Sequence, residues 1–170
     1  MPGLPTEAEM NSRVAIRCAT EKDARAISAL IRKNADVVLS AHYSREQLAA
    51  WKRYNTPASV RQRLAQRTTF CAFFGRRLCA TIALQDTELV GLYVSPGSRG
   101  KGMGRALLEH LEGFAAMQGI AALHLTSTPA ALDFYLRNGW RAQHKVVLTI
   151  LGIDFEETFM SKRLIRLVLS

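Results

Sequence analysis

The sequence predicts a single α/β domain, of the α+β kind, in which helices pack on a mixed sheet. Segments with the two-residue period of strands alternate with segments whose apolar residues recur at helical spacing. Near the middle, a strand, a glycine-rich loop, a helix and another strand follow one another, which predicts two parallel strands joined by a right-handed crossover. A chain of 170 residues can bury a core as one domain. We expect this domain to span 13–170, after a flexible tail over 1–12.

The first third of the chain predicts one strand and three helices. Alternation of side chains indicates the strand, and Thr20 is a suitable N-cap for the first helix. Ser44 and Gln47 have the spacing of a capping box, and Pro57 suits the first turn of the third helix. The expected elements are a strand over 13–18 and helices over 20–34, 44–51 and 57–66.

From residue 68 the hydrophobic period changes to that of strands. The segment 75–77 separates two such runs and predicts a hairpin, which would place Cys71 and Cys79 nearly opposite each other. Another turn at 85–87 leads into a third strand. The expected strands cover 69–74, 78–84 and 89–94.

The second half of the chain predicts two helices among three further strands. One helix begins near Met103, presents an apolar face and ends at Gly119. The other has Thr128 as its N-cap and Pro129 in its first turn, and it ends at Asn138. The expected strands cover 120–126, 140–148 and 154–162.

Charge and cysteine content limit the classes of function. The formal net charge is +9, but the 23 lysine and arginine residues are scattered and no nucleic-acid recognition motif accompanies them. We therefore expect a solvated surface with one anionic ligand site. No run of eighteen apolar residues occurs, so no membrane span is expected. Three cysteines without metal-ligand spacing favour free thiols and a reducing, cytoplasmic setting.

A glycine-rich basic loop before Met103 has the features of an anion site. Where such a loop opens a helix, the first four helical N–H groups lack partners within the helix and lie at the positive end of its dipole, where phosphate binds. The loop lacks the Walker A pattern of nucleoside-triphosphate sites and the glycine spacing of dinucleotide sites. It combines small residues with cations, namely Arg99, Gly100, Lys101, Gly102, Gly104 and Arg105.

Arg99, Gly102 and Gly104 fit the pattern Arg/Gln-x-x-Gly-x-Gly/Ala. In this respect the loop resembles the pyrophosphate-binding motif of the GNAT superfamily of acyl-CoA N-acyltransferases. The segments 16–23 and 159–164 resemble the first and last elements of the same family. The resemblance spans most of the chain and is weakest over 37–66, where the family varies with its acceptor.

The helix after residue 128 carries a second resemblance. Ala131, Phe134, Tyr135 and Gly139 match the A-x-x-F-Y-x-x-x-G-F segment that lies beside the coenzyme A arm in GNAT proteins. Thr128 stands where many members have an asparagine that contacts the pantetheine arm or the acceptor. A threonine hydroxyl can still form a hydrogen bond there.

The resemblance implies a fold and a reaction. The fold is a mixed, mostly antiparallel central sheet of about six to seven strands, splayed between two parallel strands and flanked by about four to five helices. The reaction moves an acetyl group from acetyl-CoA, the cosubstrate, to the primary amine of a small molecule or a protein, by direct attack in a ternary complex. No metal is implied. The residues expected to contact coenzyme A are Leu92, Tyr93, Val94, Arg99, Gly100, Lys101, Gly102, Met103, Gly104, Arg105, Thr126, Thr128, Ala131 and Phe134.

Acetylation of an amine needs a base, because an alkylammonium group with a pKa of about 10.4 is charged at neutral pH. Glu88 stands where GNAT members with a strand-borne glutamate base have that residue; the alternative is a surface glutamate at a strand start. Tyr135 matches the family tyrosine that would protonate the departing thiolate; the alternative is a core tyrosine. The resemblance also implies a bulge that frees the strand N–H groups around 92–94, which would then polarise the thioester carbonyl.

Several alternatives stay open. The chain could be a catalytically idle acyl-CoA-binding or regulatory module, and nucleic-acid binding is a minor alternative. The four histidines lack the spacing of metal ligands, so no metal site is expected. Pairing into a homodimer through C-terminal strands is also open. Four residues could line the acceptor pocket or could simply be solvated or packed against helices: His42, Tyr43, Trp51 and Tyr54.

Overall fold

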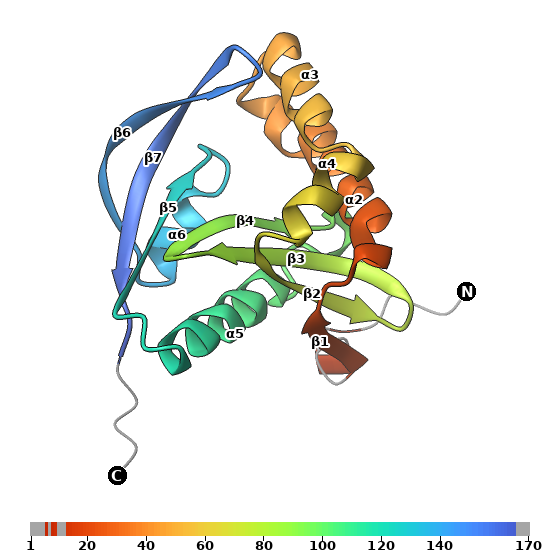
Figure 1. Ribbon diagram of the computed structural model, residues 1–170, viewed down its shortest axis with the longest axis vertical. Coiled ribbons are helices and arrows are strands. Elements are labelled where there is room, and N and C mark those ends of the chain that lie inside the picture. Colours follow the sequence, from red (N-terminus) through yellow and green to blue (C-terminus); the bar gives the residue numbers. More distant parts are fainter. Residues whose placement is uncertain (1–5, 7, 10–12, 166–170) are drawn as a thin grey trace.

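The computed structural model describes residues 6, 8, 9 and 13–165 (Figure 1). The other residues of the expected tail, and residues 166–170 of the expected domain, lie outside the described residues. Within the described residues, seven strands form one sheet in the order β1-β2-β3-β4-β5-β7-β6. The strands are β1 Val14–Cys18, β2 Thr68–Phe74, β3 Arg77–Gln85, β4 Glu88–Val94, β5 Ala122–Ser127, β6 Arg141–Ile150 and β7 Ile153–Arg163. The helices are α2 Ala24–Val37, α3 Arg45–Tyr54, α4 Pro57–Leu64, α5 Met103–Met117 and α6 Leu132–Arg137, with 3₁₀ turns η1 Glu21–Asp23, η2 Leu39–Ala41 and η3 Pro96–Ser98.

The strand arrangement confirms the expected mixed, mostly antiparallel sheet of the GNAT fold. All neighbouring strands are antiparallel except β4 and β5, which run parallel. These two strands pair at Glu88 and His124, where the N–H of His124 also donates to the carbonyl of Thr87 at 3.1 Å. Beyond this point they separate, and the sheet divides into two halves that cross at a steep angle (Figure 1).

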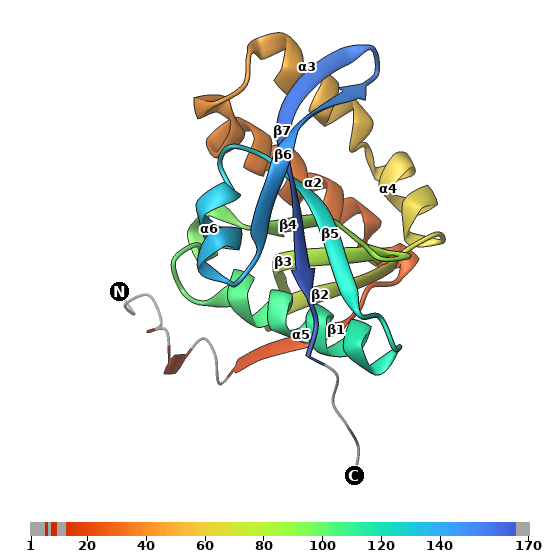
Figure 2. The ribbon, with the colours of Figure 1, turned by 90° about the vertical axis from the view of Figure 1, so that its left-hand side faces the viewer.

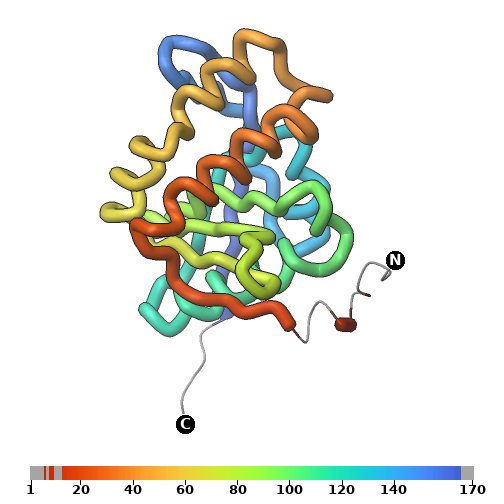
Figure 3. The backbone as a smooth tube through the Cα atoms, turned by 90° about the vertical axis from the view of Figure 1, so that its right-hand side faces the viewer, coloured from red at the N-terminus to blue at the C-terminus, as the bar shows by residue number. Residues whose placement is uncertain are grey.

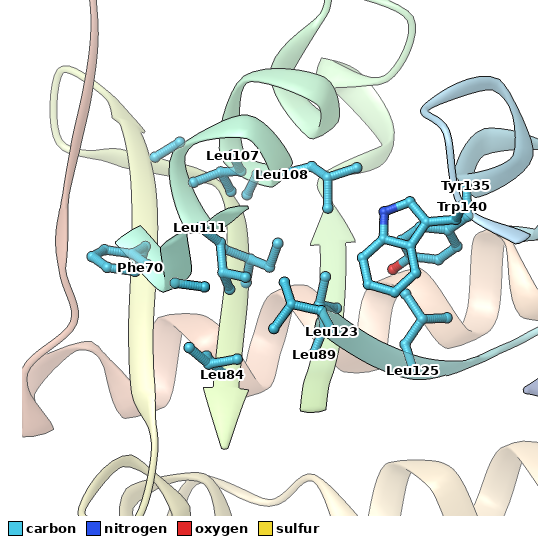
Figure 4. Packing of buried hydrophobic residues seen from close by; sticks show 14 of the residues in the cluster. Phe70, Leu84, Leu89, Leu107, Leu108, Leu111, Leu123, Leu125, Tyr135 and Trp140 are labelled. Carbon is cyan, nitrogen blue, oxygen red and sulfur yellow. The ribbon is translucent and has the colours of Figure 1, made fainter. Parts of the chain in front are cut away.

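Helices cover both faces of the sheet. On one face, α5 packs on β2, β3 and β4, and its leucines point toward these strands (Figure 4). On the other face, α2 crosses β3 and β4, with α3 and α4 beside it (Figure 3). The helix α6 lies near the end of β4 that diverges from β5 (Figure 2). Among the described residues, no helix has both the length and the apolar character that a bilayer crossing requires.

A hydrogen-bonded ion pair ties α5 to the second half of the sheet. Glu112 of α5 accepts a bond from the indole N–H of Trp140 at 3.0 Å and pairs with Lys162 of β7 at 2.8 Å. Lys162 also donates to the carbonyl of Asn138, at the end of α6, at 2.8 Å. Because both charged side chains are largely buried, this contact fixes α5 relative to α6 and β7.

Local hydrogen bonds explain where the first helices begin. The expected capping box of Ser44 and Gln47 opens α3, and the Thr56 hydroxyl caps α4, with Pro57 in its first turn. Thr20 starts the 3₁₀ turn η1 through a capping box with Asp23, and α2 follows directly. The helix α2 reaches Val37, beyond the predicted end.

The predicted start of the helix after β5 was wrong. The carbonyl of Thr128 accepts from the N–H of Ala131 at 3.1 Å, so 128–131 is a turn. The helix α6 begins only at Leu132, and no side chain caps it. Because the turn takes up residues 128–131, the helix itself is only six residues long.

The two buried cysteines are not opposite each other. Cys71 pairs with Thr81, and a register shift after Ala72 leaves Cys79 outside the ladder of paired residues. Both thiols are free and buried, as expected. Burial raises the pKa of Cys71 to about 11, which keeps this thiol protonated and unreactive at neutral pH.

The packing of α5 gives a stability prediction. Replacement Leu111→Ala should lower the free energy of unfolding by about 2–5 kcal/mol, because this side chain is fully buried between α5 and the sheet. Met117→Ala, on the same helix but 79% exposed, is the control and should change it by less than about 0.5 kcal/mol. Denaturant unfolding followed by circular dichroism measures both, and equal effects would contradict the packing described.

Candidate active site

The separation of β4 and β5 opens a cavity of about 1290 Å³. Its walls come from β4, the following loop, the start of α5, the end of β5 and α6, and on the other side from α2, α3 and α4. Of the residues predicted to contact coenzyme A or to act in catalysis, Lys101 alone does not line it. The predicted residues that do are Glu88, Leu92, Tyr93, Val94, Arg99, Gly100, Gly102, Met103, Gly104, Arg105, Thr126, Thr128, Ala131, Phe134 and Tyr135.

A β-bulge in β4 determines which side chains face each side of the sheet. Leu84 of β3 pairs with Leu89 and Ile82 pairs with Leu92, so two residues of β4 stand opposite one of β3. One of the two is Gly91, whose φ of +136° is unfavourable for other residues. Because of the bulge, Leu89 and Leu92 both pack in the core under α5.

After the bulge, amide groups of β4 face the cavity. The N–H of Ser95 bonds to the carbonyl of Cys79 in β3, whereas the carbonyl of Val94 accepts from the Asn34 side chain of α2 at 3.0 Å. Strand amides alternate between the two edges, so the N–H groups of Leu92 and Val94 point away from β3, toward the gap beside β5. An extended ligand in this gap could pair with them as an additional strand does.

The loop after β4 ends at a helix start that no side chain caps. Gly102 is the N-cap of α5 with a φ of +76°, and Gly100 has a φ of +73°. A Cβ atom on Gly104 would lie 3.3 Å from Val94 Cγ2 and 3.4 Å from Phe134 Cε2. The glycines thus permit the turn and bring β4, α5 and α6 together around the first-turn N–H groups. These groups are suited to an anion.

Cations lie around this helix start. Arg99 is exposed and Arg105 forms an exposed 2.8 Å ion pair with Glu109 one turn further along α5. Both arginines line the cavity. Within residues 6, 8, 9 and 13–165, histidine, cysteine and carboxylate side chains do not gather in groups of three that could hold a metal ion.

Tyr135 lies at the cavity with its ring in the core. It is 5% exposed and packs edge-on against Phe134, at 5.3 Å between ring centroids, and against Trp140, at 5.8 Å (Figure 4). Burial is the main cause that raises the pKa of its hydroxyl, followed by the charges of Tyr93 and Glu157. Tyr135 is therefore protonated at neutral pH, and burial makes it a weaker acid than an exposed phenol.

Glu157 is a cavity residue that sequence reasoning missed. It lies on β7, is 3% exposed, and accepts a hydrogen bond from the Tyr43 hydroxyl at 3.4 Å. Burial raises the pKa of its carboxyl to about 7, although hydrogen bonds from Thr126 and Tyr43 act in the opposite direction. A signal was present in the sequence, because Glu157 follows Phe155 at the strand period and so occupies an apolar position.

Glu88 lines the cavity at the start of β4, away from the loop that precedes α5. It is half-buried and lies where β4 and β5 still pair. Leu92 is four residues further along β4, and a strand rise of about 3.3 Å per residue places their Cα atoms up to about 13 Å apart. Glu88 therefore reaches a group bound at Leu92 only through an intervening molecule.

The aromatic residues proposed for an acceptor pocket divide into two groups. Trp51 and Tyr54 line the cavity, whereas His42 and Tyr43 do not. The indole N–H of Trp51 is buried and makes no hydrogen bond of good geometry within the described residues, although it lies close enough to Tyr93 to favour ionisation of that hydroxyl. Arg63 stacks on the Tyr54 ring at 4.2 Å and donates to Asn55 at 2.8 Å.

Comparisons with known proteins agree with this geometry. The sequence model of the acetyltransferase (GNAT) domain matches residues 39–157. No curated protein sequence matches the chain. A crystal structure of a GCN5-related N-acetyltransferase from Rhodopseudomonas palustris is 26% identical, with a TM-score of 0.84 over 88% of this chain and 95% of that one.

Two more distant structures share the fold. PaiA N-acetyltransferase from Thermoplasma acidophilum, in complex with coenzyme A, is 21% identical, with a TM-score of 0.76 over 88% of this chain and 98% of that one. A phosphinothricin acetyltransferase from Sinorhizobium meliloti, in complex with acetyl-CoA, is 19% identical, with a TM-score of 0.69 over 89% of each chain. The domain match covers more than half of the sequence and includes β4 and β5, where the sheet splays, so the chain belongs to the GNAT acetyltransferase family.

Proposed function

We propose that the protein is an N-acetyltransferase that moves the acetyl group of acetyl-CoA to a primary amine in a ternary complex. The observation that carries this proposal is that one cavity contains both an uncapped helix start lined by glycines and the unpaired edge of a splayed strand. The first feature suits a diphosphate and the second an extended amide-containing arm, and coenzyme A has both.

The diphosphate binds at the start of α5. The N–H groups of the first turn donate to its oxygens, while Arg99 and Arg105 neutralise its charge. The pantetheine arm runs into the gap between β4 and β5, where the N–H groups of Leu92 and Val94 face it. One of these N–H groups donates to the thioester oxygen and stabilises the negative charge that develops on it.

Tyr135 protonates the thiolate. As the amine nitrogen forms its bond to the carbonyl carbon, the carbon–sulfur bond breaks and the electron pair stays on sulfur. Tyr135 lines the same cavity and its phenol is protonated at neutral pH, so it can donate a proton to the sulfur. The family resemblance suggests Glu88, which lines the cavity, as one candidate for the base, acting through a water molecule.

The acceptor amine binds on the α2, α3 and α4 side of the cavity. Apolar and aromatic side chains dominate that wall, including Ile31, Trp51 and Tyr54. An apolar wall also removes water from the amine, and desolvation of this kind lowers the pKa of an ammonium group. The cytoplasmic setting expected from free thiols is consistent with the buried thiols of Cys71 and Cys79.

Loop substitutions test the diphosphate site. Gly104→Glu should weaken acetyl-CoA binding by on the order of tenfold or more, because a side chain there meets Val94 and Phe134 and adds negative charge at the helix start. Gly102→Glu should act in the same direction. Calorimetry with acetyl-CoA measures the dissociation constants.

The matched control for these variants is Gly113→Ala. Gly113 lies on α5 too, but a Cβ atom there meets nothing within 4 Å, so binding should not change. The substitution should also stabilise the helix by about 0.5–1 kcal/mol. If acetyl-CoA bound equally well to all three variants and to the wild type, the diphosphate assignment would be refuted.

A turnover measurement distinguishes an acetyltransferase from a catalytically idle acyl-CoA-binding module. Thiol release from acetyl-CoA is measured with a panel of primary alkylamines, amino acids and a lysine peptide. Wild type should release thiol with at least one amine, and Tyr135→Phe should lower kcat by about 10²–10⁴-fold without weakening acetyl-CoA binding. A wild type that binds acetyl-CoA but acetylates none of these amines would favour the idle module.

A further inference from the structure

We infer that Glu157 is the general base that accepts a proton from the acceptor amine. The inference rests on the proposed function and deepens it, because it assigns the proton acceptor to a carboxylate of β7 in place of Glu88, the candidate on β4. Two observations support it, the place of Glu157 in the cavity and the absence of a cationic partner for its charge.

Glu157 lies where the elements that would hold the reacting groups converge. Thr126 of β5 and Tyr43, just before α3, form hydrogen bonds with its carboxyl group. Tyr93 of β4 and Tyr135 of α6 are both close enough for its charge to raise the pKa values of their hydroxyls. The carboxylate therefore shares one region of the cavity with the proposed acid, Tyr135, and with the strand whose N–H groups face the thioester.

Among the described residues, no lysine, arginine or histidine forms an ion pair with Glu157. In the part of the chain that the structure describes, ion pairs form at Asp23, Asp36, Glu109 and Glu112, and none involves Glu157. The titratable groups that interact with it are the hydroxyls of Tyr43, before α3, Tyr93 of β4 and Tyr135 of α6. A buried carboxylate without a cationic partner destabilises a fold, so its presence calls for a ligand or a reaction.

An alkylammonium acceptor is such a ligand. It provides the missing positive charge on binding and then gives up a proton to the same carboxylate. Burial raises the pKa of Glu157 to about 7, so at neutral pH the group is partly ionised and is a stronger base than an ordinary glutamate. An exposed carboxylate, with a pKa of about 4.3, would be a poor acceptor for this proton.

The proton and electron balance is complete with residues in the cavity. The Glu157 carboxylate accepts one ammonium proton, which frees the nitrogen electron pair for attack on the carbonyl carbon. The carbon–sulfur bond then breaks, and Tyr135 donates its proton to the sulfur. The nitrogen then loses its second proton to the phenolate of Tyr135, which becomes a neutral phenol again. Glu157 later releases its proton to solvent. The products are an amide and a free thiol.

The test compares three glutamine variants in the thiol-release assay with the same amine panel. Glu157→Gln should lower kcat/KM by about 10²–10⁴-fold, while acetyl-CoA affinity measured by calorimetry stays unchanged. Glu156→Gln is the matched control, because Glu156 is the exposed neighbour on β7 and should keep wild-type activity. Glu88→Gln should lose less activity than Glu157→Gln.

The pH profile distinguishes a base from a structural group. In the wild type, kcat/KM should rise with pH through an apparent pKa near that of Glu157, about 7, and Glu157→Gln should remove this limb while Glu156→Gln retains it. If Glu157→Gln kept both the limb and the activity of Glu156→Gln, or if Glu88→Gln lost more activity, the assignment of Glu157 would be overturned. A wild type that releases no thiol with any amine would overturn the proposed function itself.

Thermal unfolding supplies a readout that needs no acceptor. The pKa of Glu157 is higher in the folded chain than in the unfolded chain. The free energy of unfolding of the wild type should therefore fall as pH rises from about 4.5 to about 7 and the carboxyl group ionises. The Tm of Glu157→Gln relative to wild type should therefore increase between pH 5 and pH 8. A Tm below that of wild type at pH 8, together with lost activity, would indicate a structural role and overturn the inference.

Discussion

The structure depends on the limited pairing between two parallel strands. β4 and β5 are held together only near Glu88 and His124, and from there they diverge. A sheet that opens in this way leaves strand amides without partners, which is unfavourable unless another group binds them. The bulge at Gly91, the bond from Asn34 to the Val94 carbonyl and the crossing of the two half-sheets all preserve this opening. The cavity is therefore a product of backbone geometry first, and side chains refine it.

The cavity has cationic groups at its solvent side and a carboxylate surrounded by hydroxyl groups in its interior. Cations and helix N–H groups gather at the solvent side, where Arg99 and Arg105 are exposed. Deeper in, hydroxyl groups surround one carboxylate, and burial favours the protonated forms of all of them. An ordered set of neutral donors beside a single group of intermediate pKa can exchange protons without large changes in net charge. The arrangement thus fits proton transfer better than it fits permanent ion pairing.

Much of this architecture could be predicted from the sequence, because its signals are local. The glycine loop, the capping box of Ser44 and the period of each strand lie within a few consecutive residues, and they indicated the helix start at the cavity and the order of elements. The N-cap role of Thr128 was predicted wrongly, since its carbonyl accepts a hydrogen bond in a turn before α6 begins. Glu157 was missed because only the pairing of β7 with β5 brings it beside residues far away in the chain.

The ion pair at Glu112 has a consequence for how this protein can vary. One side chain on α5 holds the indole of Trp140, while its partner Lys162 also binds the carbonyl at Asn138. The helix that begins at the loop is thereby kept at a set spacing from the segments that carry Tyr135 and Glu157. A substitution at Glu112 or Lys162 would shift both Tyr135 and Glu157 relative to α5. Residues 112 and 162 are therefore expected to change together, in pairs that keep the contact.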